Sequence, residues 1–164
     1  MTATFTRILF ATDLSINSTC ALKRASELAS ATGARLHLLH VTEPISDDAR
    51  ITIQMFVQSE QARLEALGTR TEYARAILDE RLKVFWESIP EDAERIRAQI
   101  HSTDVIEGHP AEVILRRGKE LACDLIVLGA HNHGFTQTFL GSVAKRVLRR
   151  ARIPTLVVPY VAEG

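Results

Sequence analysis

Cysteine is scarce in this chain, and a long apolar run and a signal-like amino terminus are both absent. Two cysteines in 164 residues are too few for a disulfide-stapled secreted module, so we expect Cys20 and Cys123 to be thiols in a reducing compartment. No apolar stretch approaches the roughly 20 residues that cross a bilayer. The first residues lack the basic and then apolar pattern of a secretory signal. We therefore expect a cytoplasmic protein without a membrane segment.

An excess of charge of either sign is also absent. Twenty basic residues balance twenty acidic ones, so the formal net charge is zero. A general binder of nucleic acid or other polyanions needs a basic excess, and we expect no nucleic-acid partner. Only local charge patterning remains informative.

Three common catalytic or cofactor motifs are missing as well. The chain has no G-x-x-x-x-G-K-[ST] phosphate loop, no G-x-G-x-x-G dinucleotide fingerprint and no G-x-S-x-G nucleophile turn. These absences argue against a dedicated kinase, motor ATPase, dehydrogenase or serine hydrolase. Ser142 also has no predictable Asp-His pair beside it that could activate it as a nucleophile.

Short apolar runs alternate with helical periodicity along the whole chain. We expect one domain over residues 1–164. Strands buried on both faces are predicted at 8–11, 36–41, 125–128 and 155–158, with a weaker third strand in chain order between 96 and 106. The alternation predicts an α/β fold with an open sheet of five parallel strands.

Residues 46–90 read as helical with one interruption. Thr69 to Glu72 forms a capping-box pattern directly after Gly68, which predicts that one helix ends and another starts there. The part at about 46–68 is expected to be a helical excursion from the core fold. The second helix carries an apolar stripe with steps of three and four residues, namely Ala74, Leu78, Leu82, Phe85 and Ile89.

The ends of the predicted strands supply a candidate ligand site. In open α/β sheets, ligands bind beyond the carboxyl ends of strands where the strand order reverses, and we expect the first and fourth strands to be neighbours there. Asp13 could accept hydrogen bonds from an adenine amine or a ribose hydroxyl. The apolar side chains that could enclose a base are Ala11, Val41 and Leu128.

The segment that follows the fourth strand could hold a phosphate. We expect Gly129 to turn the chain off the strand with its amides exposed, and Gly141 to allow a close backbone approach. Ser142 offers a hydroxyl at a helix amino terminus, where unpaired amides and the positive helix end favour an anion. From these residues alone, an ordinary strand-to-helix connection with a capping serine remains open, as does a turn-forming role for Asp13.

The histidines and basic side chains near this segment indicate a function less specifically. His131 and His133, with His40 across the strand ends, lack supporting Cys, Asp or Glu at metal-site spacing, so we expect solvent-facing histidines and no metal site. His131 remains a candidate phosphate contact. Arg149, Arg150 and Arg152 suit the negative end of the last helix, whereas Lys145 and Arg146 in its first turn would be better explained by a nearby anion.

The order and spacing of six segments, which together span nearly the whole chain, resemble those of the universal stress protein family. The segments are ILFATD at 8–13, LLHV at 38–41, GHPAE at 108–112, CDLIVLG at 123–129, LGSV at 140–143 and PTLVVP at 154–159. The resemblance implies a Rossmann-like fold with helices on both faces of the sheet, a dimer, and in one branch of the family an ATP site. That branch carries the pattern G-x2-G-x9-G-[ST].

The resemblance assigns the pattern to particular residues of this chain. Its first and last glycines fall on Gly129 and Gly141 and its hydroxyl on Ser142, while Asp13 and Val41 match the positions that place the nucleoside. The middle glycine is replaced by Asn132, Gly134 stands two residues later, and the loop is one residue shorter than the pattern. Asparagine adopts the left-handed conformation more readily than most residues, so a similar turn is feasible. The expected nucleotide-binding residues are Ala11, Thr12, Asp13, Val41, Leu128, Gly129, His131, Gly141, Ser142 and Val143.

The resemblance implies a stress-response protein that senses or signals rather than catalyses, with at most weak ATP hydrolysis. Its ligand would be ATP, or AMP or ADP, with Mg²⁺ arriving on the phosphates. It would form a homodimer through the strand Thr155–Val158, although Pro154 and Pro159 could instead simply blunt that edge. The alternative is a dimeric protein-interaction module of the same family that does not bind nucleotide.

Overall fold

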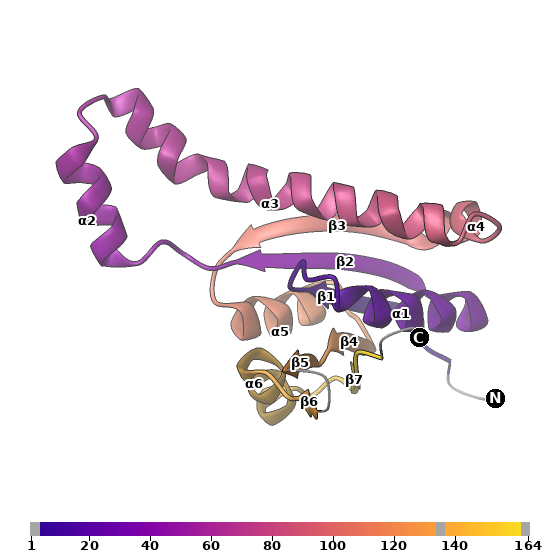
Figure 1. The fold of residues 1–164 in the computed structure, drawn as a ribbon. Helices are drawn as coiled ribbons and strands as arrows, with labels where there is room; N and C mark the ends of the chain where they lie inside the picture. Colours follow the sequence, from indigo (N-terminus) through magenta and orange to yellow (C-terminus); the bar gives the residue numbers. More distant parts are fainter. Residues whose placement is uncertain (1–3, 134–136, 162–164) are drawn as a thin grey trace.

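The fold is an open parallel sheet between two layers of helices. The computed structural model describes residues 4–133 and 137–161 (Figure 1). Five parallel strands lie in the order β3-β2-β1-β4-β7, which confirms the predicted α/β sheet. Their bounds are β1 Arg7–Thr12, β2 Arg35–Thr42, β3 Ile100–Glu107, β4 Leu125–Gly129 and β7 Thr155–Val158.

The strand order reverses at β1. The chain runs from β1 outward through β2 to β3 on one side, then crosses to β4 and β7 on the other. β1 pairs with both β2 and β4, with Ala11 opposite Leu39 and Leu128. The carboxyl ends of β1 and β4 therefore form the switch point at which such sheets bind ligands.

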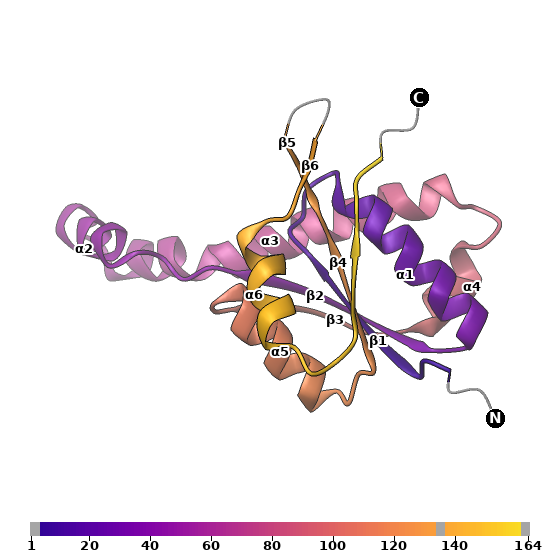
Figure 2. The same cartoon turned by 90° about the horizontal axis from the view of Figure 1, so that it is seen from below.

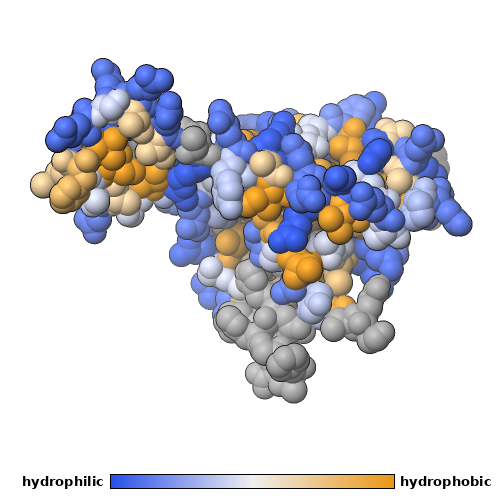
Figure 3. Space-filling model, turned by 45° about the horizontal axis from the view of Figure 1, so that its top comes forward, coloured by the Kyte–Doolittle hydropathy of each residue, from blue (hydrophilic) through white to orange (hydrophobic). Residues whose placement is uncertain are grey.

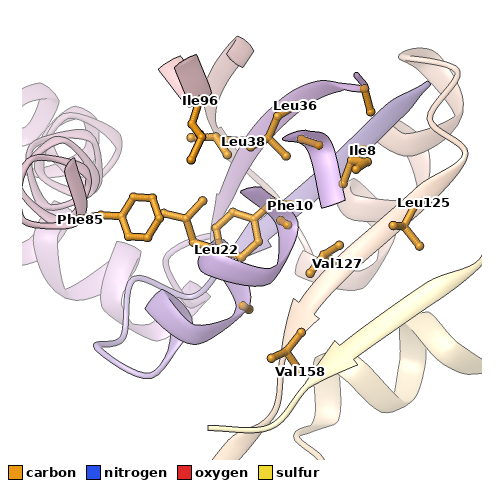
Figure 4. Packing of buried hydrophobic residues seen from close by; sticks show 14 of the residues in the cluster. Ile8, Phe10, Leu22, Leu36, Leu38, Phe85, Ile96, Leu125, Val127 and Val158 are labelled. Atoms are coloured by element: carbon orange, nitrogen blue, oxygen red, sulfur yellow. The ribbon is translucent and has the colours of Figure 1, made fainter. Parts of the chain in front are cut away.

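Helices cover both faces of the sheet (Figure 2). One layer holds α1 Ser18–Thr32, α3 Glu60–Ser88 and α4 Ala93–Gln99, and the other holds α5 Pro110–Glu120 and α6 Ser142–Arg150. Side chains alternate along each strand, so Ile8 and Phe10 pack toward the first layer while Leu9 and Ala11 pack toward the second. Figure 4 shows the first cluster, in which Phe85 of α3 and Leu22 of α1 close over the strands.

Asp124 fastens β4 to the start of β1. Its carboxylate accepts hydrogen bonds from Thr6 N at 2.8 Å, Thr6 Oγ1 at 2.9 Å and Arg7 N at 3.1 Å. Partial burial alone would raise the pKa of the Asp124 carboxyl, but these bonds favour the charged form and bring its pKa below the ordinary value. The pairing of the first and fourth strands is thus secured at the end opposite the switch point.

The predicted helix break at Gly68 is wrong. α2 Asp47–Phe56 is followed by its C-cap Val57, and α3 then runs unbroken from Glu60 through Gly68 to Ser88. The cap is Ser59, whose hydroxyl accepts a hydrogen bond from Ala62 N. A glycine inside a helix costs only about 1 kcal/mol relative to alanine, which a long continuous helix outweighs. The predicted apolar stripe is confirmed, because Ala74, Leu78 and Phe85 are buried and Leu82 and Ile89 pack against the core.

The segment 46–66, which we call the arm, projects from the body of the molecule (Figures 1 and 2). α2 has no buried residue. The turn between its two helices is held by Arg63, whose guanidinium donates to the carbonyl oxygens of Val57 and Gln54. Figure 3 shows an apolar patch at the tip of the arm. Its large exposed side chains are Ile51, Met55, Phe56 and Leu64.

Two further details differ from the sequence-based expectations. α4 occupies residues up to Gln99, so β3 begins at Ile100 rather than near 96. A small antiparallel hairpin, β5 His131–His133 with β6 Gln137–Phe139, follows β4 and had not been expected. Strands of three residues are too short for an alternating pattern to indicate them. Cys123 lies in the turn between α5 and β4.

Candidate functional site

The carboxyl ends of β1, β2 and β4 surround a crevice of about 250 Å³ at the predicted switch point. The amino-terminal parts of α1, α5 and α6 complete its wall. Its lining residues are Ala11, Thr12, Asp13, Ser15, Asn17, Ser18, His40, Val41, Glu43, Pro110, Ile114, Leu128, Gly129, Ala130, Val143 and Ala144.

The turn after β1 is fixed by a chain of short hydrogen bonds. Thr12 Oγ1 accepts from Leu14 N at 3.0 Å and donates to Ser18 Oγ at 3.0 Å, and Ser18 Oγ donates to the Ser15 carbonyl oxygen at 2.7 Å. Leu14 has a left-handed backbone with φ of 65°. A non-glycine residue rarely adopts this conformation, so the hydrogen bonds hold the turn in a strained shape that strand propensity alone would not produce.

Asp13 lies exposed at the mouth of the crevice, on this turn. Its Oδ1 accepts a hydrogen bond from Ser15 N at 2.9 Å, so the turn-forming role considered from the sequence is real. A carboxylate has about four acceptor positions, so the bond to Ser15 N does not by itself prevent a contact between Asp13 and a ligand. The two readings of Asp13 are therefore compatible with each other.

The β2 wall is formed by His40 and Val41. His40 Nδ1 lies 2.7 Å from the Thr12 carbonyl oxygen, and because a carbonyl only accepts, Nδ1 must carry the proton. Nε2 of the neutral ring is then an acceptor. Val41 is buried and contributes apolar surface, as do Ala11 and Leu128.

Gly129 does not turn the chain off the strand, so that expectation is wrong. It is the last residue of β4, pairs with Val158 and has no left-handed backbone. A Cβ built on it would lie 3.7 Å from Ala21 Cβ, an ordinary contact, so the fold itself does not require glycine. A side chain at this position would instead fill the space between β4 and Ser18 and Ala21 of α1.

The start of α6 presents unpaired amides. Gly141 is its N-cap, with φ of −66° and ψ of 165° and no side-chain capping bond, and Lys145 N makes the first intrahelical bond to the Gly141 carbonyl oxygen at 3.0 Å. The amides of Ser142, Val143 and Ala144 precede that bond and have no intrahelical partner. Such a helix end favours an anion.

Seven of the ten predicted site residues line the crevice. They are Ala11, Thr12, Asp13, Val41, Leu128, Gly129 and Val143. Gly141 and Ser142 stand at the adjacent helix start but are not among the lining residues. The side chains of His131, Asn132 and His133 and the whole of Gly134 lie outside the described part of the structure. The α1 residues Asn17 and Ser18 were missed, although a helix that starts directly after β1 must point its first turn at the same crevice.

No metal centre is evident among the described residues, where no three His, Cys, Asp or Glu side chains converge. No helix within 4–133 or 137–161 has both the length and the apolarity to cross a bilayer.

The fold is that of an open parallel α/β protein with a crevice at the switch point of its sheet, where ligands bind in proteins of this architecture. The chain belongs to the universal stress protein family, whose family model matches residues 4–159. It is 33% identical over 156 residues to a universal stress protein of Thermus aquaticus encoded beside a sulfhydrylase, covering 94% of this chain and 98% of that one. It is 31% identical over 138 residues to universal stress protein G of Salmonella typhimurium, covering 84% and 86%.

Solved structures share the fold. Universal stress protein UspA from Lactobacillus plantarum superposes with a TM-score of 0.70 at 22% identity, covering 96% of this chain and 99% of that one. A universal stress protein in complex with cAMP gives 0.58 at 22% identity, covering 97% and 100%. One from Archaeoglobus fulgidus in complex with dAMP gives 0.52 at 16% identity, covering 95% and 99%. The Rossmann-like architecture is thereby confirmed.

Proposed function

We propose that the crevice binds an adenine nucleotide, with ATP as the principal ligand. This proposal rests on three kinds of group that surround or adjoin one crevice. Its walls are apolar, Asp13 stands at its opening, and the start of α6 has no side-chain cap. Apolar walls suit a base, Asp13 suits an adenine amine or a ribose hydroxyl, and the α6 amides suit phosphate.

The size of the crevice supports a particular placement. Ligand pockets usually measure about 300–1,000 Å³, and this hollow of about 250 Å³ lies just below that range. It suits the base and sugar, with the phosphates at the open end beside Gly129 and Val143. Mg²⁺ would then be held mostly by phosphate oxygens and water.

The relatives in complex with cAMP and dAMP support the choice of adenine. We extend that ligand class to this chain because the residues that would meet a base here are apolar and those at the mouth accept hydrogen bonds.

We propose a sensing or signalling role rather than an enzymatic one, with at most weak ATP hydrolysis. A hydrolase needs a general base poised at the water that attacks the γ-phosphate. His40 is the one histidine lining the described crevice, and its Nδ1 lies against the Thr12 carbonyl oxygen rather than a carboxylate, so the described crevice holds no Asp-His pair that would raise the basicity of Nε2. We also propose a cytoplasmic location, because Cys20 and Cys123 are both free thiols.

Calorimetric titration of nucleotide-free protein tests the proposal. We expect ATP to release heat with a dissociation constant in the micromolar range or tighter, and GTP to bind more weakly, because its exocyclic groups reverse the hydrogen-bonding pattern at the base. No heat and no thermal shift with millimolar ATP, AMP, cAMP or dAMP would reject nucleotide binding. Phosphate released at a rate typical of enzymes, and lost in Asp13→Ala, would reject the non-enzymatic role.

The second candidate is a dimeric interaction module whose crevice stays empty. The observation that favours it lies in the sequence after β4, where Asn132 replaces the middle glycine of the ATP-binding pattern and the loop is one residue shorter than that pattern. Both candidates include a homodimer through Thr155–Val158. They differ in whether a nucleotide purifies with the protein. The test is to denature the purified protein and to identify the released small molecules by mass spectrometry. An adenine nucleotide is expected only if the crevice binds one.

A further inference from the structure

A second hollow, lined mainly by basic side chains, lies between α5 and α6. It measures about 430 Å³ and shares no lining residue with the crevice. We call it the arginine hollow. Its lining residues are His109, Ala111, Glu112, Arg146, Arg149 and Arg150.

The guanidinium groups of the three arginines make no hydrogen bond or ion pair within the described ranges 4–133 and 137–161. Arginines elsewhere do find partners: Arg117 reaches both Asp104 and Glu120 at 3.0 Å. Glu112 is the one acidic side chain that lines the hollow. Three guanidinium charges against one carboxylate leave a local positive excess in a chain whose formal net charge is zero.

The helix itself explains only part of this arrangement. Arg149 and Arg150 stand in the last turn of α6, where positive charge suits the negative end of the helix dipole. Arg146 stands near the first turn, where the dipole disfavours it. It is also four residues from Arg150, and like charges at that spacing destabilise a helix by a few tenths of a kcal/mol. Arg146 is therefore a cost to the isolated helix that a bound anion would offset.

We propose that the arginine hollow binds an oligophosphate, a ligand with at least two linked phosphate groups. The guanidinium group presents a planar fork of donors that matches phosphate oxygens two at a time. Arg146 and Arg150 lie about 6 Å apart along the helix axis, with Arg149 beside them on the next turn. That spread suits several phosphate groups in a row better than one.

The proposal does not rest on nucleotide binding in the crevice. The oligophosphate could be a free chain or the tail of a second nucleotide, since both present the same groups. Because the contacts are exposed and charged, binding is expected to weaken steeply between 50 and 300 mM salt.

Calorimetric titration with tripolyphosphate tests the proposal on the full chain. The test variant is the triple replacement Arg146→Gln, Arg149→Gln and Arg150→Gln. The control removes the same charge from exposed positions elsewhere, with Arg35→Gln, Lys83→Gln and Lys119→Gln. We expect the test variant to lose at least tenfold in affinity and the control less than threefold. Circular dichroism and thermal melting establish that both variants are folded.

Several outcomes would overturn the proposal. Equal affinity of the wild type and the test variant would place any tripolyphosphate elsewhere, including in the crevice, and no binding to the wild type at 50 mM salt would exclude the site. Equally tight, arginine-dependent binding of a glutamate decapeptide would show that the hollow takes carboxylates rather than phosphates in particular.

Nuclear magnetic resonance gives a supporting measurement. Changes in amide chemical shift in α6 and at the start of α5, with none at β1 or β4, would support binding in the arginine hollow. Comparing tripolyphosphate with ATP in the same variants separates a free chain from a nucleotide tail.

Discussion

Asp13 shows how one side chain can serve both the fold and a ligand. Its bond to Ser15 N shapes the turn after β1, and it also lines the opening of the crevice that we propose binds a nucleoside. The sequence could place it at a strand end but could not decide between these two roles, because the hydrogen-bonding partner lies two residues away in a turn whose conformation is set by Thr12 and Ser18.

Replacing Asp13 by Asn separates the two roles. The amide oxygen can still accept from Ser15 N, while the charge that strengthens hydrogen bonds to a nucleoside is lost. Hydrogen bonds to charged groups are worth about 1.5–3 kcal/mol, so we expect ATP affinity to fall roughly 10- to 100-fold with an almost unchanged melting temperature. Titration calorimetry measures the affinity, with Asp48→Asn on the arm as control. An unchanged affinity would remove Asp13 from the nucleotide site.

Cys20 and Cys123 should differ sharply in reactivity. Burial, reinforced by the neighbouring Asp124 charge, raises the pKa of the Cys123 thiol to about 11. Cys20 is half-buried on α1. Because the thiolate is the reactive form, we expect a disulfide reagent at pH 8 to label one thiol quickly in the folded protein and the second only on unfolding. Cys20→Ser should abolish the fast phase. Fast labelling of Cys123 in that variant would contradict the assignment.

His37 should make the protein sensitive to mild acid. Its ring is buried, with Nδ1 2.7 Å from Ser102 Oγ and Nε2 without a described partner. Burial lowers the His37 pKa, as do the charges of His101, Arg7 and Arg117, and only the Asp104 carboxylate opposes them. The folded state therefore takes up this proton less readily than the unfolded chain. Stability contributed by the neutral ring is present above pH about 6.5 and is lost as the pH falls below it.

Urea denaturation at pH 7.5 and 5.5 measures this effect. We expect the free energy of unfolding of the wild type to fall between these values, and that of His37→Gln to fall less. His101→Gln, which changes an exposed ring, should retain most of the wild-type fall. An equal fall in the wild type and His37→Gln would assign the acid sensitivity to other groups.

At the scale of elements, long periodic segments were predictable and short or context-dependent ones were not. Gly33 and Pro110 stand at the end of α1 and the start of α5, and such residues are readable from the sequence because their backbone requirements are local. The continuity of α3 through Gly68 depends on the whole helix rather than on the local capping pattern. The strands β5 and β6 left no recognisable pattern in the sequence. The prediction that Gly129 turns the chain off the strand was wrong, because a glycine after an apolar run can also be the last residue of the strand.

The turn between β3 and α5 offers a matched pair of glycine tests. A Cβ at Gly108 would lie 2.6 Å from Cγ2 of the buried Val113, whereas one at Gly129 meets nothing nearer than 3.7 Å. We expect Gly108→Ala to lower the free energy of unfolding by about 1–3 kcal/mol and Gly129→Ala to change it by less than about 0.5 kcal/mol. Urea denaturation measures both. Equal stabilities would mean that the β3–α5 turn relaxes freely.

At the scale of the whole molecule, the order of apolar runs determined the fold. Five short runs separated by helical segments allow few arrangements, because parallel strands need right-handed crossovers and both faces must be covered. The meeting of Ala11 and Leu128 at one crevice followed from that topology. The direction of the arm did not follow from the topology, because α2 has no buried residue that would fix it against the core.

The proposed dimer can be tested at the sheet edge. β7 pairs with β4 on one side, and Leu156 on it is 38% exposed. Charged residues on edge strands oppose pairing with another chain, so Leu156→Lys should shift the protein from dimer to monomer in size-exclusion chromatography with light scattering. Val84→Lys, an exposed apolar position on α3, is the control. A wild-type monomer, or a dimer that resists Leu156→Lys, would rule out assembly through this strand.

The continuity of α3 connects the arm directly to the body of the molecule. A helix of 29 residues is about 43 Å long, and its carboxyl-terminal half is anchored in the core through Phe85 and Trp86. On that anchored part, Arg81 Nε donates to the carbonyl oxygen of Leu14 at 3.2 Å, in the strained turn of the crevice wall. The part of the arm at residues 60–66 is therefore the start of the same continuous helix that contacts the turn at the rim of the crevice.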